Sequence, residues 1–235
     1  MKFLVALCLL VTTGGAYAQS AEAGMFKSVY AAKDVALDTE PGSAFWRGAS
    51  PVYAEVDGRG KVVPGYRTEV RSRWTGKNLY LLYVCPYEEL YLKPSPVTKV
   101  ETNELWNWDV AELFIGADFN NIRRYKEFEV SPQGEWVDLD VDLDLPDHTV
   151  GWTWNSGFEV SARIDRKAKV WYAAMRIPFA AIDERAPMTG STFRVNLFRS
   201  QGPPGRQQSI AWRAPMAATF HTPERFGTLE LVKGK

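Results

Sequence analysis

Residues 137–144 alternate strictly between apolar and acidic side chains, and this pattern restricts the fold more than any other feature of the chain. Side chains alternate between the two faces of an extended strand, so valine and leucine occupy one face here and aspartate the other. On a helix the same residues would be scattered around the axis. The apolar face has to be buried, and the segment therefore predicts a strand in a sheet that covers a core.

Further segments of strand length are separated by turn-forming residues. Gly76, Lys77 and Asn78 join two of them into a hairpin, and the sequence SPQG at 131–134 joins another two. Only residues 179–185 resemble a helix. In all, the predicted strands are 68–74, 79–85, 110–115, 125–130, 136–143, 157–164, 169–177, 193–198 and 228–232. Many strands, almost no helix and no repeat of fixed period predict an all-β fold, an antiparallel β-sandwich of the jelly-roll-like kind.

The N-terminus has the layout of a secretory signal peptide. Lys2 precedes an apolar run, and small residues follow up to Ala18. The run is far shorter than the ~20 residues that a membrane-spanning helix needs. We expect a signal peptide at 1–18 that is cleaved near Ala18, an N-terminal arm at 19–37 and a single β-sandwich domain at 38–235. The protein would then be secreted or periplasmic, without a membrane span.

Composition excludes several functional classes. Removal of the signal peptide leaves Cys85 as the single cysteine, so no internal disulfide forms and the core must supply the stability. The 28 basic and 28 acidic residues balance, which gives no sign of a nucleic-acid partner. The two histidines are not part of a zinc-protease motif, and no serine-hydrolase motif is present. The unusual feature of the composition is its aromatic content, with nine Trp, ten Tyr and twelve Phe.

Several motifs in a fixed order carry a family resemblance. They are FWRGAS, TEVRSRWTGKNLYLLYVC, LWNWDVAELFIG, YKEFEVSPQGEW, VWYAAMRIPFAAI, FRVNLFR and SIAWRAP. In this order the chain resembles the family 9 carbohydrate-binding modules and the wider DOMON-like β-sandwiches. The resemblance implies a carbohydrate-binding domain that recognises a mono-, oligo- or polysaccharide without transforming it. It also implies a role in polysaccharide recognition or catabolism, beside a separate glycoside hydrolase.

Residues 106–115 predict one side of the sugar site. A period of two places Trp106, Trp108 and Glu112 on one face. An aromatic face stacks on the C–H patches of a sugar ring, and a carboxylate accepts hydrogen bonds from its hydroxyls. The alternative is that both tryptophans are buried at the end of the sandwich. The resemblance favours Trp106 together with the acidic residue six positions later, Glu112.

The resemblance also implies a second aromatic residue near an asparagine of a later strand. The candidate asparagine is Asn196, and the residue three positions beyond it is Arg199, where the family pattern has an aromatic residue. Arg199 could stack on the sugar or donate two hydrogen bonds to it, and Trp212 could supply the second aromatic face.

Glu127 completes the predicted site. It shares a strand face with Glu129, from which it could contact a ligand or Arg124. Two carboxylates on one face also fit the ~5–9.5 Å separation that glycoside hydrolysis needs. A weakly hydrolytic enzyme, or one associated with a glycoside hydrolase, is therefore the first alternative to a binding module.

The aspartate face of residues 137–144 allows a structural calcium ion at Asp138, Asp140 and Asp142. Carboxylates on one face repel one another unless a cation or facing arginines pair with them, and we favour a solvated or arginine-paired face. The second functional alternative is a haem-binding redox module. Its axial ligands would come from His148, His221, Met175 or Met216, but the chain has no CxxCH attachment motif.

Overall fold

The computed structural model describes residues 24–145, 152 and 154–234, so the predicted signal peptide lies outside the described residues. Within these ranges, strands account for nearly all of the regular structure. The strands are β1 (Met25–Tyr30), β2 (Val52–Ala54), β3 (Thr68–Trp74), β4 (Asn78–Pro86), β5 (Val110–Gly116), β6 (Arg124–Val130), β7 (Trp136–Asp142), β8 (Glu159–Asp165), β9 (Val170–Pro178), β10 (Thr192–Gln201), β11 (Gln208–Ala211) and β12 (Gly227–Val232). Short 3-10 turns form η1 (Leu105–Asn107), η2 (Phe179–Ala181) and η3 (Pro223–Arg225).

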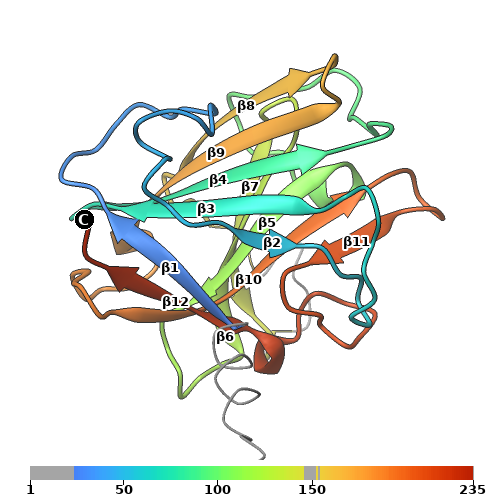
Figure 1. Ribbon diagram of the computed structural model, residues 1–235. Helices are drawn as coiled ribbons and strands as arrows, with labels where there is room; N and C mark the ends of the chain where they lie inside the picture. Colours follow the sequence, from blue (N-terminus) through green and yellow to red (C-terminus); the bar gives the residue numbers. More distant parts are fainter. Residues whose placement is uncertain (1–23, 146–151, 153, 235) are drawn as a thin grey trace, which may run out of the picture.

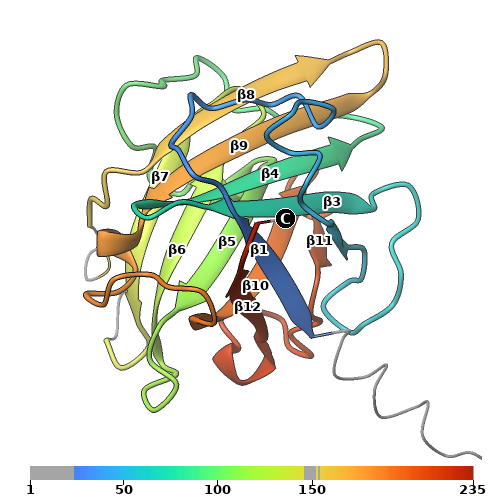
Figure 2. The same ribbon diagram turned by 60° about the vertical axis from the view of Figure 1, so that its left-hand side comes forward.

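The strands form two facing layers that are joined along one edge (Figures 1 and 2). One layer has the order β7-β6-β5-β10-β12 and the other the order β1-β3-β4-β9-β8, and the pairing of β12 with β1 makes them one continuous sheet. β2 pairs with β3, and β11 pairs with β10. The described pairings are antiparallel except those of β1, which runs parallel to both β12 and β3. The fold is therefore β-sandwich-like, and its sheet is mixed rather than purely antiparallel.

The main core fills the space between the two layers. Alternate side chains of β4, β5 and β9 point into it, because a strand presents every second residue to the same face. Leu81, Leu113 and Met175 lie there with no exposed surface. Burial of such a side chain stabilises the fold by about 1.5–3 kcal/mol. Met175 is thus a core residue, as its alternation with other apolar residues indicates.

A second apolar cluster lies on the opposite face of β5, β6, β7 and β10. It contains Val110, Phe114, Leu139 and Phe198, all buried. The apolar side of residues 137–143 belongs to this cluster and not to the space between the layers. Every residue of β5 is consequently buried, on one face by the main core and on the other by this cluster. Because loops and side chains also cover the outer face of this layer, a pocket can form between them and the strands.

Most predicted strands are confirmed, and β3 has the predicted bounds of 68–74. The sequence predicted an irregular arm where β1 lies, and it predicted neither β2 nor β11. β1 is held by pairing with strands that are distant in the chain, which a local pattern does not reveal. The helix-like segment 179–185 contains only the 3-10 turn η2. None of the described segments forms a helix that is long and apolar enough to cross a membrane.

Candidate functional site

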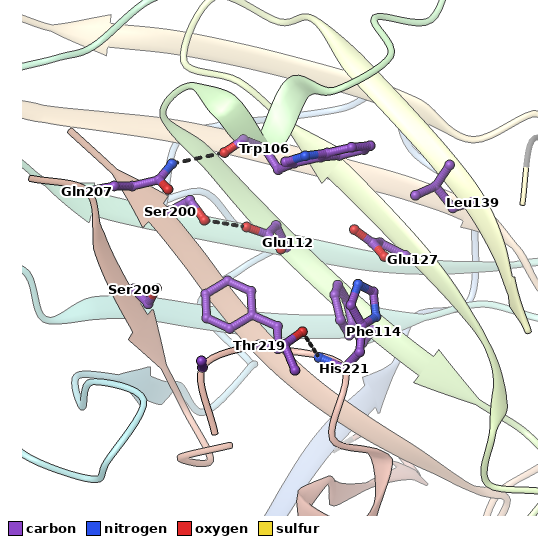
Figure 3. A pocket seen from close by; sticks show the side chains of 12 residues that line it. Trp106, Glu112, Phe114, Glu127, Leu139, Ser200, Gln207, Ser209, Thr219 and His221 are labelled. Carbon is purple, nitrogen blue, oxygen red and sulfur yellow. Dashed lines mark hydrogen bonds between the residues drawn. The ribbon is translucent and has the colours of Figure 1, made fainter. Parts of the chain in front are cut away.

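A pocket of about 200 Å³ lies on the outer face of the β5-β6-β7-β10 layer (Figure 3). Side chains from these strands, from β11 and from the loops before β5, β11 and β12 meet there. They are Trp106, Glu112, Phe114, Glu127, Leu139, Ser200, Gln207, Ser209, Ala218, Thr219, Phe220 and His221. Aromatic rings and carboxylates dominate this lining, and it includes no lysine or arginine.

Trp106 lies in η1, the turn that leads into β5. Glu104 adopts a left-handed backbone conformation with φ 58°, and the amides of Asn107 and Trp108 then donate to the carbonyl oxygens of Glu104 and Leu105. The Trp106 carbonyl oxygen accepts a hydrogen bond of 2.9 Å from a loop side chain on the other side of the pocket mouth. Figure 3 shows the indole as one wall of the pocket.

Aromatic rings form the wall across from Trp106. In Figure 3 the Glu112 and Glu127 carboxylates lie between the Trp106 indole and the rings of Phe114 and His221. The His221 ring stacks on Phe114 with centroids 5.2 Å apart. Its Nδ1 lies 2.6 Å from the Tyr125 hydroxyl oxygen, a hydrogen bond that fixes the ring orientation.

Phe220 extends this wall towards the pocket mouth. Its ring stacks almost parallel to that of Phe198, with centroids 4.1 Å apart and an interplanar angle of 8°. Phe198 is fully buried in β10, whereas Phe220 belongs to the loop before η3 and lines the pocket. A strand residue thus holds a loop ring in place, and the pocket gains a second flat apolar surface.

Three buried glutamates lie at the base of the pocket. Glu112 of β5 is directly paired with Glu129 of β6, and Glu127 lies two residues away on the same face of β6. Glu112 and Glu127 line the pocket, and Glu129 has no exposed surface. One carboxylate oxygen of each residue lies within 4.8 Å of those of the other two. Strand pairing therefore holds three acidic groups together.

Burial raises the pKa of all three carboxyl groups, because the charged form loses its hydration. The pKa of Glu127 rises to about 7. Burial and then the neighbouring carboxylates raise the pKa of Glu112 and Glu129 well above the usual value. Ser200 Oγ donates a hydrogen bond of 2.9 Å to Glu112. Hydrogen-bond donors or a cation from a ligand would therefore meet acceptors that are already desolvated.

Trp108 is directed away from this pocket. The 3-10 turn interrupts the period of two before β5, and the Trp108 ring stacks on Tyr91 of the 86–104 loop with centroids 4.6 Å apart. The neighbouring Asp109 accepts hydrogen bonds from the amides of Tyr91, at 3.1 Å, and Gly202, at 2.7 Å. This segment therefore ties two long loops to the start of β5.

Asn196 is buried on β10 and does not line the pocket. Its Nδ2 donates to the Arg213 carbonyl oxygen at 2.9 Å, and its Oδ1 accepts from the Arg213 amide at 3.0 Å. These two bonds fasten the segment after β11 to β10. The side chain in this structure supports the backbone around the site.

Arg199 points to the other side of β10. An odd offset of three residues from Asn196 reverses the strand face, so Arg199 enters the interior and is fully buried. It donates to the Pro86 carbonyl oxygen at 2.7 Å and to the Thr68 hydroxyl at 3.3 Å, and it also bonds Gln201. The β10 residue that does line the pocket is one position further on.

Trp212 is likewise a packing residue. Its ring approaches Phe26 with centroids 6.2 Å apart, and it covers Gly227, where the space for a Cβ atom is already filled by the indole. It contacts the main core and does not line the pocket. The second aromatic face expected from Trp212 is provided instead by the loop before η3.

The aspartates of β7 face basic residues of β6, apart from Asp138. Asp140 pairs with Lys126 at 2.6 Å and Asp142 with Arg124 at 2.8 Å. Asp138 is buried and accepts a hydrogen bond of 2.7 Å from the Ser156 amide. The favoured interpretation, a face paired with basic side chains, agrees with these ion pairs. These ion pairs relieve the repulsion at Asp140 and Asp142.

The candidate haem ligands are dispersed. Met175 lies in the main core, Met216 is exposed, His221 lines the pocket, and His148 lies outside the described residues. The three described candidates do not share a site, so the described geometry gives the haem alternative no support.

Trp106, Glu112 and Glu127 were predicted from the sequence to share a site, and all three line the pocket. Most of the other lining residues were not predicted. The period of two that starts at Asn196 places Ser200 on the same strand face, so Ser200 could have been predicted. Gln207 follows a Gly-Pro-Pro-Gly loop, and long loops often carry binding residues. His221 lies in the motif HTPERFG, which resembles a family signature with an expected structural role, and nothing in the local sequence pointed to Phe220. The place of both residues in the pocket follows from the tertiary fold.

Comparison with known proteins identifies the family of the chain and proteins of similar fold. Residues 38–234 match the family described as "Carbohydrate family 9 binding domain-like". An "Extracellular protein" of Arthroderma benhamiae is 27% identical over 181 residues, covering 72% of this chain and 80% of that protein. A family 9 carbohydrate-binding module from Caldicellulosiruptor kristjanssonii has a similar fold in its complex with cellotriose, with a TM-score of 0.64, 12% identity, and 90% and 95% of the two chains covered. Its glucose complex gives a TM-score of 0.62, 12% identity and coverage of 89% and 97%. The chain therefore belongs to the family 9 carbohydrate-binding domain-like proteins.

Proposed function

We propose that this is an exported, non-catalytic carbohydrate-binding protein and that the pocket beside Trp106 holds the sugar. The observation that carries the proposal is the placement of the Glu112 and Glu127 carboxylates between the Trp106 indole and the His221 ring (Figure 3). A sugar ring has apolar C–H faces and a polar rim. Flat rings on opposite sides with hydrogen-bonding groups between them match that distribution.

The polar lining suits a ligand rich in hydroxyl groups. Glu112 and Glu127 offer acceptors, while the side chains of Ser200, Ser209 and Gln207 offer donors and acceptors. The buried carboxylates gain from a hydroxyl donor because their hydration is already lost. Each net hydrogen bond contributes on the order of 1 kcal/mol, so affinity in the micromolar to millimolar range is expected.

The pocket volume favours a short ligand. About 200 Å³ is below the roughly 300–1,000 Å³ of typical drug-sized sites. One sugar ring, free or at the end of a chain, fits this size better than a continuous run of rings. The neighbours of similar fold were solved with cellotriose and with glucose, so glucose and short cello-oligosaccharides are the first ligands to test.

The composition of residues 1–18 and the extracellular relative both support export. An exported protein of this kind would assist polysaccharide recognition or catabolism by bringing a separate glycoside hydrolase, or the cell, to its substrate. Co-purification with a hydrolase from the source culture tests that partnership.

Isothermal titration of the mature protein with glucose, cellotriose and a wider glycan panel tests sugar binding. Trp106→Ala should lower the affinity at least tenfold, because the stacking surface is lost. Trp108→Ala is the matched control, since it removes a tryptophan of the same turn region outside the pocket. Equal loss in both variants, or no binding to any glycan, would refute the assignment.

One observation favours hydrolysis as a second candidate function. The carboxylates of Glu112, Glu127 and Glu129 are close together, and burial raises their pKa, which are conditions that suit a general acid. A hydrolase would release reducing sugar from a polysaccharide and would lose this activity in Glu112→Gln or Glu127→Gln. If the protein binds glycans of a broad panel and releases no product from any of them, hydrolysis is refuted and binding is the remaining function.

A further inference from the structure

We propose that Glu112, Glu127 and Glu129 hold a calcium ion at the base of the pocket. The geometry allows one carboxylate oxygen from each residue to reach a common point. These oxygens lie within 4.8 Å of one another. Calcium binds oxygens at about 2.3–2.6 Å, so two ligands on opposite sides of the ion lie up to roughly 5 Å apart. The spacing of the three oxygens therefore fits one ion.

A second observation points to a ligand for this cluster. Both carboxylate oxygens of Glu129 and Oε2 of Glu127 are buried, and within the described part of the chain no N–H or neutral O–H group donates a hydrogen bond to them. Their near neighbours are one another. Glu129 has no exposed surface, and Glu127 is 3% exposed. Buried polar groups are normally paired, and a buried carboxylate without a partner is costly. A cation between the three residues would satisfy these oxygens together.

No lysine or arginine among the residues that the structure describes fills this role. The ion pairs of the described residues involve none of the three glutamates. Arg199 points to the other face of β10, where Pro86 and Thr68 accept its hydrogen bonds. The cluster differs in this respect from the acidic face of β7, whose Asp140 and Asp142 are paired with basic residues.

The remaining coordination positions lie on the open side. Glu112 and Glu127 line the pocket, so water reaches the ion from that direction. Calcium takes six to eight oxygen ligands in flexible geometry, and three carboxylates with several waters satisfy it. Dissociation constants of about 10⁻⁴–10⁻³ M are typical of calcium sites in extracellular modules and are expected here. The ion would bind with or without a sugar present.

The test is calcium titration of the mature, EDTA-treated protein, by calorimetry and by thermal unfolding. One calcium ion should bind and raise the unfolding temperature. Glu129→Gln should weaken calcium binding at least tenfold, and circular dichroism should show that the variant is folded. Asp140→Asn, in the acidic face of β7, should bind calcium as the parent does.

Three outcomes would overturn the proposal. The first is absence of calcium binding at a calcium concentration of about 10⁻² M, ten times the weakest expected dissociation constant. The second is a Glu129→Gln variant that binds calcium as tightly as the parent. The third is loss of calcium binding in Asp140→Asn alone. Because calcium binding is measured without sugar, its failure would not bear on the sugar site. Failure of sugar binding would likewise leave the calcium result intact.

Discussion

Gln207 Nε2 donates a hydrogen bond of 2.9 Å to the carbonyl oxygen of Trp106, a residue 101 positions earlier in the chain. The bond joins the loop before β11 to the turn η1, whose Trp106 indole forms a wall of the pocket. The site thus depends on a contact between two loops as well as on the strands beneath them.

Gln207→Ala should therefore weaken sugar binding about fivefold, since one net hydrogen bond is worth about 1 kcal/mol. The free energy of unfolding should change little, because both loops are at the surface. Gln208→Ala is the control, as Gln208 does not line the sugar pocket. Calorimetry would contradict this account if the two variants had the same affinity.

Phe220→Ala should lower sugar affinity by removing the second flat surface. An aromatic contact contributes about 0.5–1.5 kcal/mol beyond burial, so loss of the contact between this ring and the sugar should lower the affinity roughly two- to twelvefold. Phe220→Tyr keeps the ring and should retain most of the affinity. Calorimetric titration of both variants with the tightest-binding sugar measures the two affinities. An unchanged affinity in Phe220→Ala would show that Phe220 does not contact the sugar.

Arg199→Met tests the structural role of the buried arginine. The substitution leaves the Pro86 oxygen and the Gln201 side chain without their donor and should reduce the free energy of unfolding by about 2–4 kcal/mol. Sugar affinity of the folded fraction should be unchanged, because the guanidinium lies on the far face of β10. Urea unfolding and calorimetry measure the two effects separately. A stable variant without sugar binding would instead place Arg199 in the site.

The pH dependence of stability should carry a contribution from Glu101. Burial, and then Asp138, raises the pKa of Glu101 to about 7. A carboxyl group whose pKa is raised by folding stabilises the native state below its unfolded pKa of about 4.3, and this contribution is lost as pH rises through the folded value. Among the described residues, Glu101 interacts with Asp138, and Asp138 interacts with Glu101 and Ser156.

The free energy of unfolding, measured in EDTA, should therefore fall between pH 5 and pH 8 because Glu101 ionises in the folded protein. Glu101→Gln, which can donate to Asp138 at any pH, should show a flatter profile than the parent. Urea unfolding at several pH values gives the difference between the two proteins. Parallel profiles would show that the pKa of Glu101 is not raised.

The faces of the central strands could be predicted because alternation is a local property. From Val110 onward, the residues predicted to share a face do so, and Glu112 and Glu127 reach the pocket as expected. The same rule predicts that Arg199 and Asn196 lie on opposite faces of β10. Their joint assignment to the site followed the family pattern rather than the strand geometry.

Other parts of the site depend on information that the local pattern lacks. The left-handed backbone at Glu104 starts a 3-10 turn and separates Trp106 from Trp108. The rings of Phe220 and His221 reach the pocket only when their loop crosses the β5-β6-β10 surface. β1 shows the same limit for the fold, because its parallel partners lie far away in the chain.

The most direct test of sugar binding beside Trp106 is two-dimensional NMR of the mature protein with ¹⁵N-labelled tryptophan indoles. The indole resonances are assigned by single substitutions and followed during titration with glucose or cellotriose. The Trp106 indole should shift with a saturable dependence on ligand, while the Trp108 and Trp212 indoles move little. Saturable binding that shifts Trp108 or Trp212 and leaves Trp106 unmoved would contradict the proposed site.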